Sequence, residues 1–186
     1  MRRLTTIFIA IGLCLALSSF STVAAPIPHL KLEKVDSEIL VGEAFDIDVM
    51  AVGVAALDEV LAFGFDVIHS SSFKLNQATV GTGFNDDSAM FPNTDVAGSA
   101  FPGIPGGNDI LLATLNFTPS LAGVFSLVIY SDLADPNEGL FTFDFPQVDI
   151  TTCDTVNVNA VPIPTTIMLL GTGLAGLILV RRRFRR

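Results

Sequence analysis

The sequence predicts an all-β fold, an antiparallel β-sandwich, with an N-terminal signal peptide helix before it and a short C-terminal transmembrane helix after it. Apolar and polar residues alternate over short runs, which is typical of strands with one buried face. Turn-forming residues separate these runs, as in sandwiches. Residues 25–160 lie between the two apolar ends of the 186-residue chain and are enough for one domain with a sizeable core.

The N-terminal residues have the organisation of a secretory signal peptide. Residues 1–3 include two arginines, residues 7–17 are apolar, and residues 18–25 are small and polar. This order favours a cleaved signal over a first membrane span, and it predicts export through the Sec pathway. We prefer cleavage after Ala24 to cleavage after Ala25, because the second would leave proline at the new N-terminus.

Each alternating run predicts one strand. We expect strands at residues 29–33, 45–49, 60–68, 111–117, 123–130 and 141–145, and two more short strands within residues 148–159. The run 123–130 is apolar on both faces, as in a central strand. Residues 81–108 contain six glycines and three prolines, which predicts a long surface excursion with room for one short strand near Phe84. Core-facing phenylalanines should be mostly buried: Phe45, Phe63, Phe65, Phe117, Phe143 and Phe145.

Residues 25–160 are strongly acidic. They hold all 19 acidic residues but only three of the 10 basic ones, Lys31, Lys34 and Lys74, which leaves a formal charge of −16. Nucleic acid is excluded as a partner, because its phosphates would be repelled, and an anionic membrane surface is disfavoured for the same reason. The charge favours a soluble, self-repelling extracellular domain or one that binds divalent cations.

Cys153 is the only cysteine left after signal-peptide cleavage, so no internal disulfide can form. We expect its thiol to be buried in a strand, and pairing with another chain is the alternative.

The loop at residues 131–139 contains four closely spaced side chains whose oxygen atoms can bind calcium: Asp132, Asp135, Asn137 and Glu138. A solvated turn is the favoured alternative, because Asp, Pro, Asn and Gly are turn formers. Asp86 and Asp87 form a weaker pair of the same kind. His29 and His69 lack a zinc-ligand spacing, which favours structural or surface roles for both.

The sequence predicts no catalytic residues. It contains neither a Gly-x-Ser-x-Gly elbow nor a phosphate loop, and among 19 acidic residues a pair of carboxylates is uninformative. A lectin-like role is disfavoured, because sugar sites usually stack rings on Trp or Tyr and the chain has no Trp and one Tyr, Tyr130. We expect no cofactor other than calcium.

The last residues combine a proline motif, an apolar run and a basic cluster. The motif consists of Val161, Pro162, Ile163 and Pro164. Residues 167–180 carry no charge, and as a helix they would measure about 21 Å against a hydrocarbon core of about 30 Å. Arginines beside an apolar segment stay on the cytoplasmic side, which places the domain outside: Arg181, Arg182, Arg183, Arg185 and Arg186.

This order of three parts resembles the C-terminal signal of PEP-CTERM proteins, in its VPxP variant, because Ile163 stands where the motif usually has Glu. The resemblance implies recognition by an exosortase, a membrane-embedded cysteine transpeptidase. It also implies an exporting Gram-negative bacterium that makes an extracellular polysaccharide matrix. The inner membrane would then hold the precursor only until the tail is removed. A permanent single-pass anchor is the alternative.

A second resemblance lies in the domain itself. Residues 41–45, 63–67 and 112–117, followed by Gly123, have the order and spacing of cohesin-type domains. The resemblance implies a nine-stranded jelly-roll sandwich, and cohesins bind dockerin partners in cellulosomes. This chain has no dockerin-like calcium loop of its own.

These features predict an exported, non-catalytic protein that is displayed at or released from the cell surface and associated with extracellular polysaccharide or a surface protein. It would comprise a signal peptide (1–24), an acidic sandwich (25–160) and a sorting tail (161–186). The alternative is a calcium-dependent, carbohydrate-binding or protein-binding adhesion module on a permanent anchor. A secreted enzyme is the least favoured class.

Overall fold

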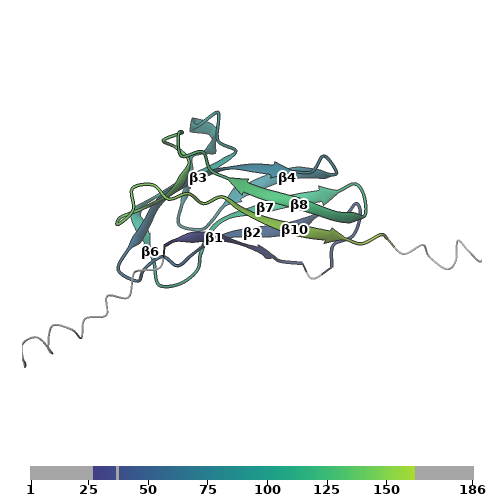
Figure 1. The fold of residues 1–186 in the computed structure, drawn as a ribbon, viewed down its shortest axis with the longest axis horizontal. Coiled ribbons are helices and arrows are strands. Elements are labelled where there is room, and N and C mark those ends of the chain that lie inside the picture. Colours follow the sequence, from purple (N-terminus) through teal and green to yellow (C-terminus); the bar gives the residue numbers. More distant parts are fainter. Residues whose placement is uncertain (1–26, 37, 162–186) are drawn as a thin grey trace, which may run out of the picture.

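The computed structural model describes residues 27–36 and 38–161, which form two antiparallel sheets packed face to face (Figure 1). This confirms the predicted all-β sandwich. The four-stranded sheet has the order β1-β2-β7-β4, and the six-stranded sheet has the order β10-β8-β3-β6-β5, with β9 paired to β3. The elements are β1 (His29–Lys34), β2 (Phe45–Val52), β3 (Glu59–His69), β4 (Phe73–Val80), β5 (Asn85–Asp86), η1 (Ser88–Met90), β6 (Val96–Pro105), β7 (Ile110–Pro119), β8 (Gly123–Tyr130), β9 (Gly139–Thr142) and β10 (Thr152–Val158).

The predicted signal peptide helix and C-terminal helix lie outside the described residues. Within residues 27–36 and 38–161, no helix has both the length and the apolar character that a membrane crossing requires. The described chain begins and ends at opposite ends of the long axis of the sandwich (Figure 1).

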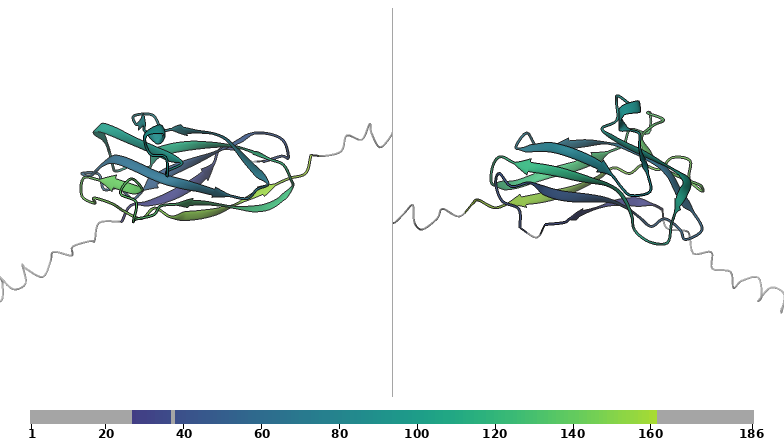
Figure 2. Two further views of the ribbon diagram at one scale, coloured as in Figure 1. Left: turned by 90° about the horizontal axis from the view of Figure 1, so that it is seen from above. Right: turned by 180° about the vertical axis from the view of Figure 1, so that it is seen from behind.

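The core between the sheets follows the alternation of the strands. Along β2, buried residues alternate with half-buried ones, and the register places Phe45 opposite Phe117 and Ile47 opposite Leu115 of β7. Fully burying such a side chain contributes about 1.5–3 kcal/mol relative to leaving it exposed. The two layers enclose one continuous apolar cluster. Figure 2 shows the two layers of strands from above and from behind.

Aromatic rings fill much of this core. The rings of Phe73 and Phe125 have centroids 5.0 Å apart, and those of Phe45 and Phe117 lie 5.9 Å apart. The ring of His69 packs edge-on against Phe117 at 5.6 Å, which is a packing role. Tilted, edge-on and stacked ring pairs of this kind stabilise the core beyond the area that the rings bury.

β3 is the central strand of the six-stranded sheet, and it is long enough to pair with three other strands. Its residues 59–65 pair with β6, its residues 66–69 pair with β8, and its residues 60–64 pair with β9. Since a strand has two edges, β6 and β9 must lie on opposite edges of the same half of β3. This arrangement brings β6, β9 and the loops next to them together around one end of β3.

The expectation that Phe143 and Phe145 are buried was wrong for Phe143 and only partly right for Phe145. Phe143 is 78% exposed, and Phe145 is half-buried. The strand ends at Thr142, because the chain reverses there: Thr142 N–H donates to the Phe145 carbonyl at 2.9 Å. After the reversal Leu140 pairs with Val148, so the alternation over 141–145 belongs to a strand end and a turn. The other four predicted core phenylalanines are buried.

The expectation of a surface excursion over residues 81–108 was wrong, because β6 occupies ten of these residues. Its glycines fit the packing instead of breaking the strand. A Cβ at Gly98 would lie 2.9 Å from the Phe63 ring, and a Cβ at Gly103 would lie 2.8 Å from Leu61 Cδ2. Gly in a strand often marks such a close approach. The short strand expected near Phe84 is present as β5.

β4 was not predicted, because its alternation is broken. A register shift between Leu75 and Gln77 inserts an irregularity where β4 pairs with β7. Phe73, Leu75, Ala78 and Val80 are the more buried positions of this strand, and their spacing changes at the shift. β4 is also an edge strand, so its outward positions are polar.

Candidate functional site

A row of apolar side chains crosses the outer face of the six-stranded sheet. The register places Cys153 of β10 opposite Val128 of β8, and Val128 opposite Ile68 of β3. We call these three residues the apolar row. Ile68 is 55% exposed and Cys153 is exposed, so the row faces solvent. The expectation of a buried Cys153 was therefore wrong: the buried positions of β10 are Val156 and Val158, and Cys153 points to the other face.

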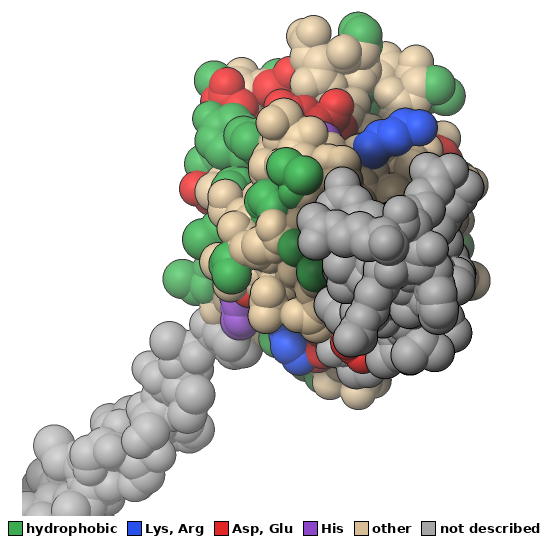
Figure 3. Space-filling model, turned by 90° about the vertical axis from the view of Figure 1, so that its right-hand side faces the viewer, with side chains coloured by type: hydrophobic (Ala, Val, Ile, Leu, Met, Phe, Trp, Pro, Cys, Tyr) green, Lys and Arg blue, Asp and Glu red, His purple; other side chains and the backbone are tan. Residues whose placement is uncertain are grey.

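β8 extends the apolar surface beyond the row. Val124 is 70% exposed and Tyr130 is 39% exposed, with Tyr130 opposite Asp66 of β3. The apolar character of both faces of β8 was visible in the sequence, and the strand does lie between two neighbours, β10 and β3. Its outward apolar residues, however, are uncovered in the described residues. Figure 3 shows hydrophobic side chains gathered along the side of this sheet, at the left of that view.

The opposite outer face, on the four-stranded sheet, is polar, and its side chains are hydrogen-bonded to one another. Thr114 donates to Asp48 Oδ1 at 2.6 Å, and Asn116 donates to Asp46 Oδ1 at 2.6 Å. Asn76 donates to Asn116 Oδ1 at 2.8 Å. Polar groups that already hold hydrogen bonds, on a face open to water, are typical of a solvated surface. The two outer faces of the sandwich thus differ sharply in chemistry.

The loop at residues 131–138, which we call the acidic loop, folds over the outer face of β3 next to the apolar row. Its backbone lies directly on Gly64, because a Cβ at that position would be 2.0 Å from the Asn137 carbonyl oxygen. The side-chain amide of Gln147 donates to the carbonyls of Asp135 at 3.0 Å and Glu138 at 2.7 Å. These bonds fix the position of the loop on the sheet.

The four residues of the predicted calcium site all lie in this loop. Three of their side chains accept hydrogen bonds from the loop backbone, and the Asn137 amide donates to Asp135 Oδ1 at 2.9 Å. Asp132 Oδ1 accepts from Ala134 N–H and Asp135 Oδ1 accepts from Asn137 N–H, both at 2.9 Å, while Glu138 Oε2 accepts from Asp132 N–H at 2.6 Å. The bonds of Asp132 and Asp135 are typical of Asx turns. In the part of the chain that the structure describes, no three His, Cys, Asp or Glu side chains are grouped to hold a metal. Calcium binding stays a prediction from composition.

Negative charge accumulates where the acidic loop meets β3. Burial raises the pKa of the Glu138 carboxyl, and the carboxylates of Asp66, Asp135 and Asp132 raise it further. Burial also raises the pKa of Asp66, helped by the charges of Asp95 and Asp135. Both shifts mean that a proton is held more tightly here than on an isolated carboxyl group. The outer face therefore combines apolar side chains with a concentrated negative field.

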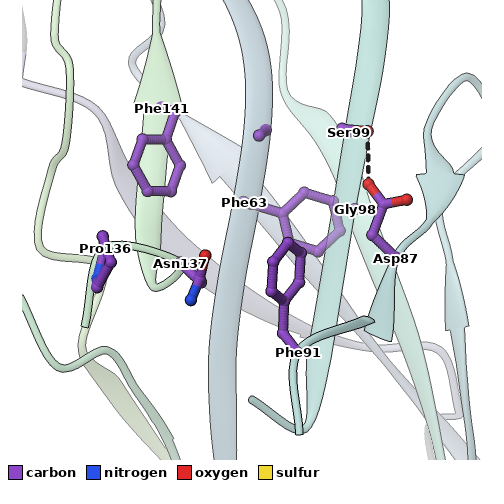
Figure 4. Close-up of a pocket in the computed structure, with 9 residues that line it drawn as sticks. Phe63, Asp87, Phe91, Gly98, Ser99, Pro136, Asn137 and Phe141 are labelled. Atoms are coloured by element: carbon purple, nitrogen blue, oxygen red, sulfur yellow. Dashed lines mark hydrogen bonds between the residues drawn. The ribbon is translucent and has the colours of Figure 1, made fainter. Parts of the chain in front are cut away.

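A cleft of about 330 Å³ opens beside the acidic loop, at the end of β3 that β6 and β9 flank on opposite edges. Pro136, Asn137 and Phe141 line one side, and Asp87 and Phe91 line the other (Figure 4). Ala62, Gly98 and Ser99 belong to the strands that form its floor. Sequence reasoning did not find this cleft, although Asp87 and the acidic loop were both singled out, because only the strand register brings them together.

The sorting motif lies at the boundary of the described residues. Val161 is exposed and lies three residues after the end of β10 at Val158. Pro162, Ile163, Pro164 and the arginine cluster lie outside the described residues, so the sorting tail stays a prediction.

Comparison with solved structures identifies the architecture. A cohesin module from a family 33 glycoside hydrolase of Clostridium perfringens superposes with a TM-score of 0.55 at 17% identity, over 73% of this chain and 99% of that chain. The sandwich has a cohesin-like fold. This agrees with the resemblance noted in the sequence, although residues 27–36 and 38–161 form ten strands where the resemblance implied nine.

Two further cohesins align less closely. A type III cohesin from a cell-surface anchoring scaffoldin of Ruminococcus flavefaciens gives a TM-score of 0.48 at 13% identity, over 77% of this chain and 93% of that chain. A type I cohesin of Pseudobacteroides cellulosolvens gives 0.45 at 15% identity, over 74% and 95%. No family model matches the chain, and no curated protein matches its sequence.

Proposed function

We propose that this chain is a non-catalytic binding module that holds a partner protein on the outer face of its six-stranded sheet. The observation that carries the proposal is the contrast between the two outer faces. The apolar row lies on one face, with Ile68 and Cys153 exposed and Val128 half-buried, whereas the other face is a hydrogen-bonded polar array. Contiguous exposed apolar surface with a polar rim marks interaction sites on soluble proteins.

A protein fits this face better than a carbohydrate. Carbohydrate sites use Trp or Tyr rings as platforms, and the chain has no Trp and one Tyr. The side chains on offer are branched and aliphatic, such as Ile68, Val124 and Val128, and these suit the apolar centre of a protein interface. Asp66 and the acidic loop beside them would supply the charged rim that steers a partner and fixes its orientation.

Display at the cell surface is the second part of the proposal, and it rests on the order of motifs in the last 26 residues. The chain would be exported by its signal peptide, held in the inner membrane, and released when an exosortase-like enzyme cuts at the motif that begins with Val161. The exposure of Val161 supports an accessible motif. Mass spectrometry of the C-terminal peptide from producing cells would test this: recovery of most molecules with residues 167–186 attached would instead support a permanent anchor.

Site-specific photocrosslinking tests the binding face. A photoreactive phenylalanine analogue would replace Val128 on the outer face of the six-stranded sheet. In a matched variant it would replace Thr79, an exposed residue that pairs with Thr114 on the polar face. In producing cells we expect one defined protein adduct from position 128 and none from position 79. The adduct should disappear when Ile68→Asp is added, because a charge would then stand in the apolar row.

Equal crosslinking from both faces would contradict the proposal, and so would an adduct from position 128 that survives Ile68→Asp. Ile68 is exposed, so its replacement leaves the core intact, and an unchanged melting temperature would confirm this for the variant.

A further inference from the structure

The cleft beside the acidic loop has apolar walls. Phe91 and Phe141 are half-buried, so part of each ring faces the opening, and Pro136 and Ala62 add further apolar surface. Figure 4 shows Phe141 and Pro136 on one side and Phe91 on the other. The volume of the cleft, about 330 Å³, is at the lower end of the range for ligand sites and is suited to one long side chain.

One carboxylate stands in the wall of this apolar cleft. Asp87 accepts the hydroxyl of Ser99 through Oδ2, and its backbone N–H donates to the Ala97 carbonyl at 3.0 Å. Both bonds tie Asp87 to β6, so its carboxylate has a fixed place relative to the rings. No ion pair among the described residues includes Asp87.

No lysine or arginine of the described residues lines the cleft. Lys31 pairs with Glu33, and Lys34 lies 3.4 Å from Asp154 Oδ2. Both are in β1, and Lys74 is in β4, so all three lie in the edge strands of the four-stranded sheet. Around the cleft the charged residues are acidic, with Asp86 next to Asp87 and Asp135 next to Pro136.

We propose that the cleft takes a lysine or arginine side chain of the partner protein. This inference rests on the proposed binding function and names the chemistry of the anchor. The aliphatic stem would lie between Phe91 and Phe141, and the cationic group would pair with Asp87. Long cationic side chains bury their stems along apolar surface in this way, and aromatic rings attract the charge. A charge-assisted bond in a partly closed cleft is stronger than one on an open surface.

Binding of short peptides to the full-length chain, held in a mild non-ionic detergent, tests the inference. The probes are acetyl-Gly-Lys-Gly-amide, its arginine counterpart, and a norleucine counterpart that keeps the stem but lacks the charge. We expect saturable NMR shift changes at Ala62, Ser99 and Phe141 with the lysine or arginine probe. The norleucine probe should bind about tenfold more weakly.

Asp87→Asn is the decisive variant, because the asparagine oxygen can still accept the Ser99 hydroxyl and the fold should persist. It should weaken lysine-probe binding about tenfold, to the level of norleucine. Asp109→Asn, an exposed acidic residue in the loop before β7, removes the same charge elsewhere and should leave binding unchanged.

Equal binding of the lysine and norleucine probes would overturn the inference, as would an Asp87→Asn variant that binds like the native chain. Shifts at the cleft caused by glucose but not by the lysine probe would also overturn it and would point to a sugar. The two proposals fail separately. A crosslinked partner without peptide binding defeats only the cationic anchor, whereas peptide binding without a crosslinked partner at position 128 defeats only the binding face.

Discussion

Asp58 shows how one buried carboxylate can hold two loops together. The residue is 1% exposed, and its Oδ1 accepts from the backbone N–H groups of Glu59 at 2.8 Å and Asp144 at 3.0 Å. Burial alone raises the pKa of Asp58, but the Thr142 hydroxyl and these backbone amides outweigh it and leave the pKa below its ordinary value. The charged form is therefore the one that the fold stabilises.

Replacing Asp58 with alanine should lower the free energy of unfolding by about 1–3 kcal/mol, because buried N–H groups lose their acceptor. The folded pKa lies below the unfolded value of about 3.9, so the contribution is complete above that pH and is lost as pH falls through the folded pKa. Urea denaturation of both proteins from pH 7 to pH 3 measures this. A stability difference that stays constant over the whole range would contradict the assignment.

The pKa of Glu138 shifts in the opposite direction to that of Asp58. Burial raises its pKa above the unfolded value of about 4.3, so its contribution to stability is complete below that pH and is lost as pH rises through the folded pKa. In Glu138→Gln the amide oxygen can still accept from Asp132 N–H. The melting temperatures at pH 5 and pH 7 should then lie closer together than in the native chain. Glu43→Gln, at an exposed position, is the charge-matched control and should retain the native difference.

At the scale of elements, the acidic loop is held on β3 by the absence of a side chain at Gly64. In Gly64→Ala the new Cβ would meet the Asn137 carbonyl oxygen at 2.0 Å, and a backbone atom cannot rotate away. We expect the loop to be displaced, with a loss of about 1–3 kcal/mol of stability. Hydrogen exchange should become faster in residues 132–138. It should remain slow in β2 and β7, and equally fast exchange there would mean general unfolding instead.

The strands that the sequence predicted are those with regular alternation and branched or aromatic residues. Residues 45–49, 60–68, 111–117 and 123–130 all fall within observed strands. β4 was missed because a register shift breaks its period. β6 was missed because Gly98 and Gly103 look like strand breakers unless their β3 neighbours, Phe63 and Leu61, are known. A glycine in the sequence can mark either a turn or a strand position where a neighbouring side chain packs closely on the backbone. Only the tertiary structure distinguishes the two cases.

The candidate site was less predictable than the fold. Alternation places side chains on two faces but does not say which face meets the core, so Cys153 and Phe143 were assigned to the wrong environment. The apolar row joins residues 68, 128 and 153, which are distant in the sequence and meet only through the register of three strands. The cleft also depends on the acidic loop and the turn at Phe91 lying on opposite sides of β3, which no local pattern in the sequence predicts.

At the scale of the whole molecule, the excess of negative charge lowers the stability of the folded state. The sandwich carries 19 carboxyl groups and three lysines, so its folded state repels itself. Raising NaCl from about 10 mM to about 150 mM should raise the melting temperature, because the Debye length falls to about 8 Å. CaCl₂ at matched ionic strength should add nothing further, since the carboxylates of the acidic loop already hold backbone N–H groups. An additional rise that Asp132→Asn abolishes would establish calcium binding at the loop.

The position of the lysines has a practical consequence. All three lie in β1 and β4, the two edges of the four-stranded sheet, and Lys74 is exposed without an ion-pair partner among the described residues. The side-chain amines that an amine-reactive sensor surface couples therefore all lie on that sheet. Attachment through these lysines would leave the apolar row and the cleft free of coupled residues, without an added tag.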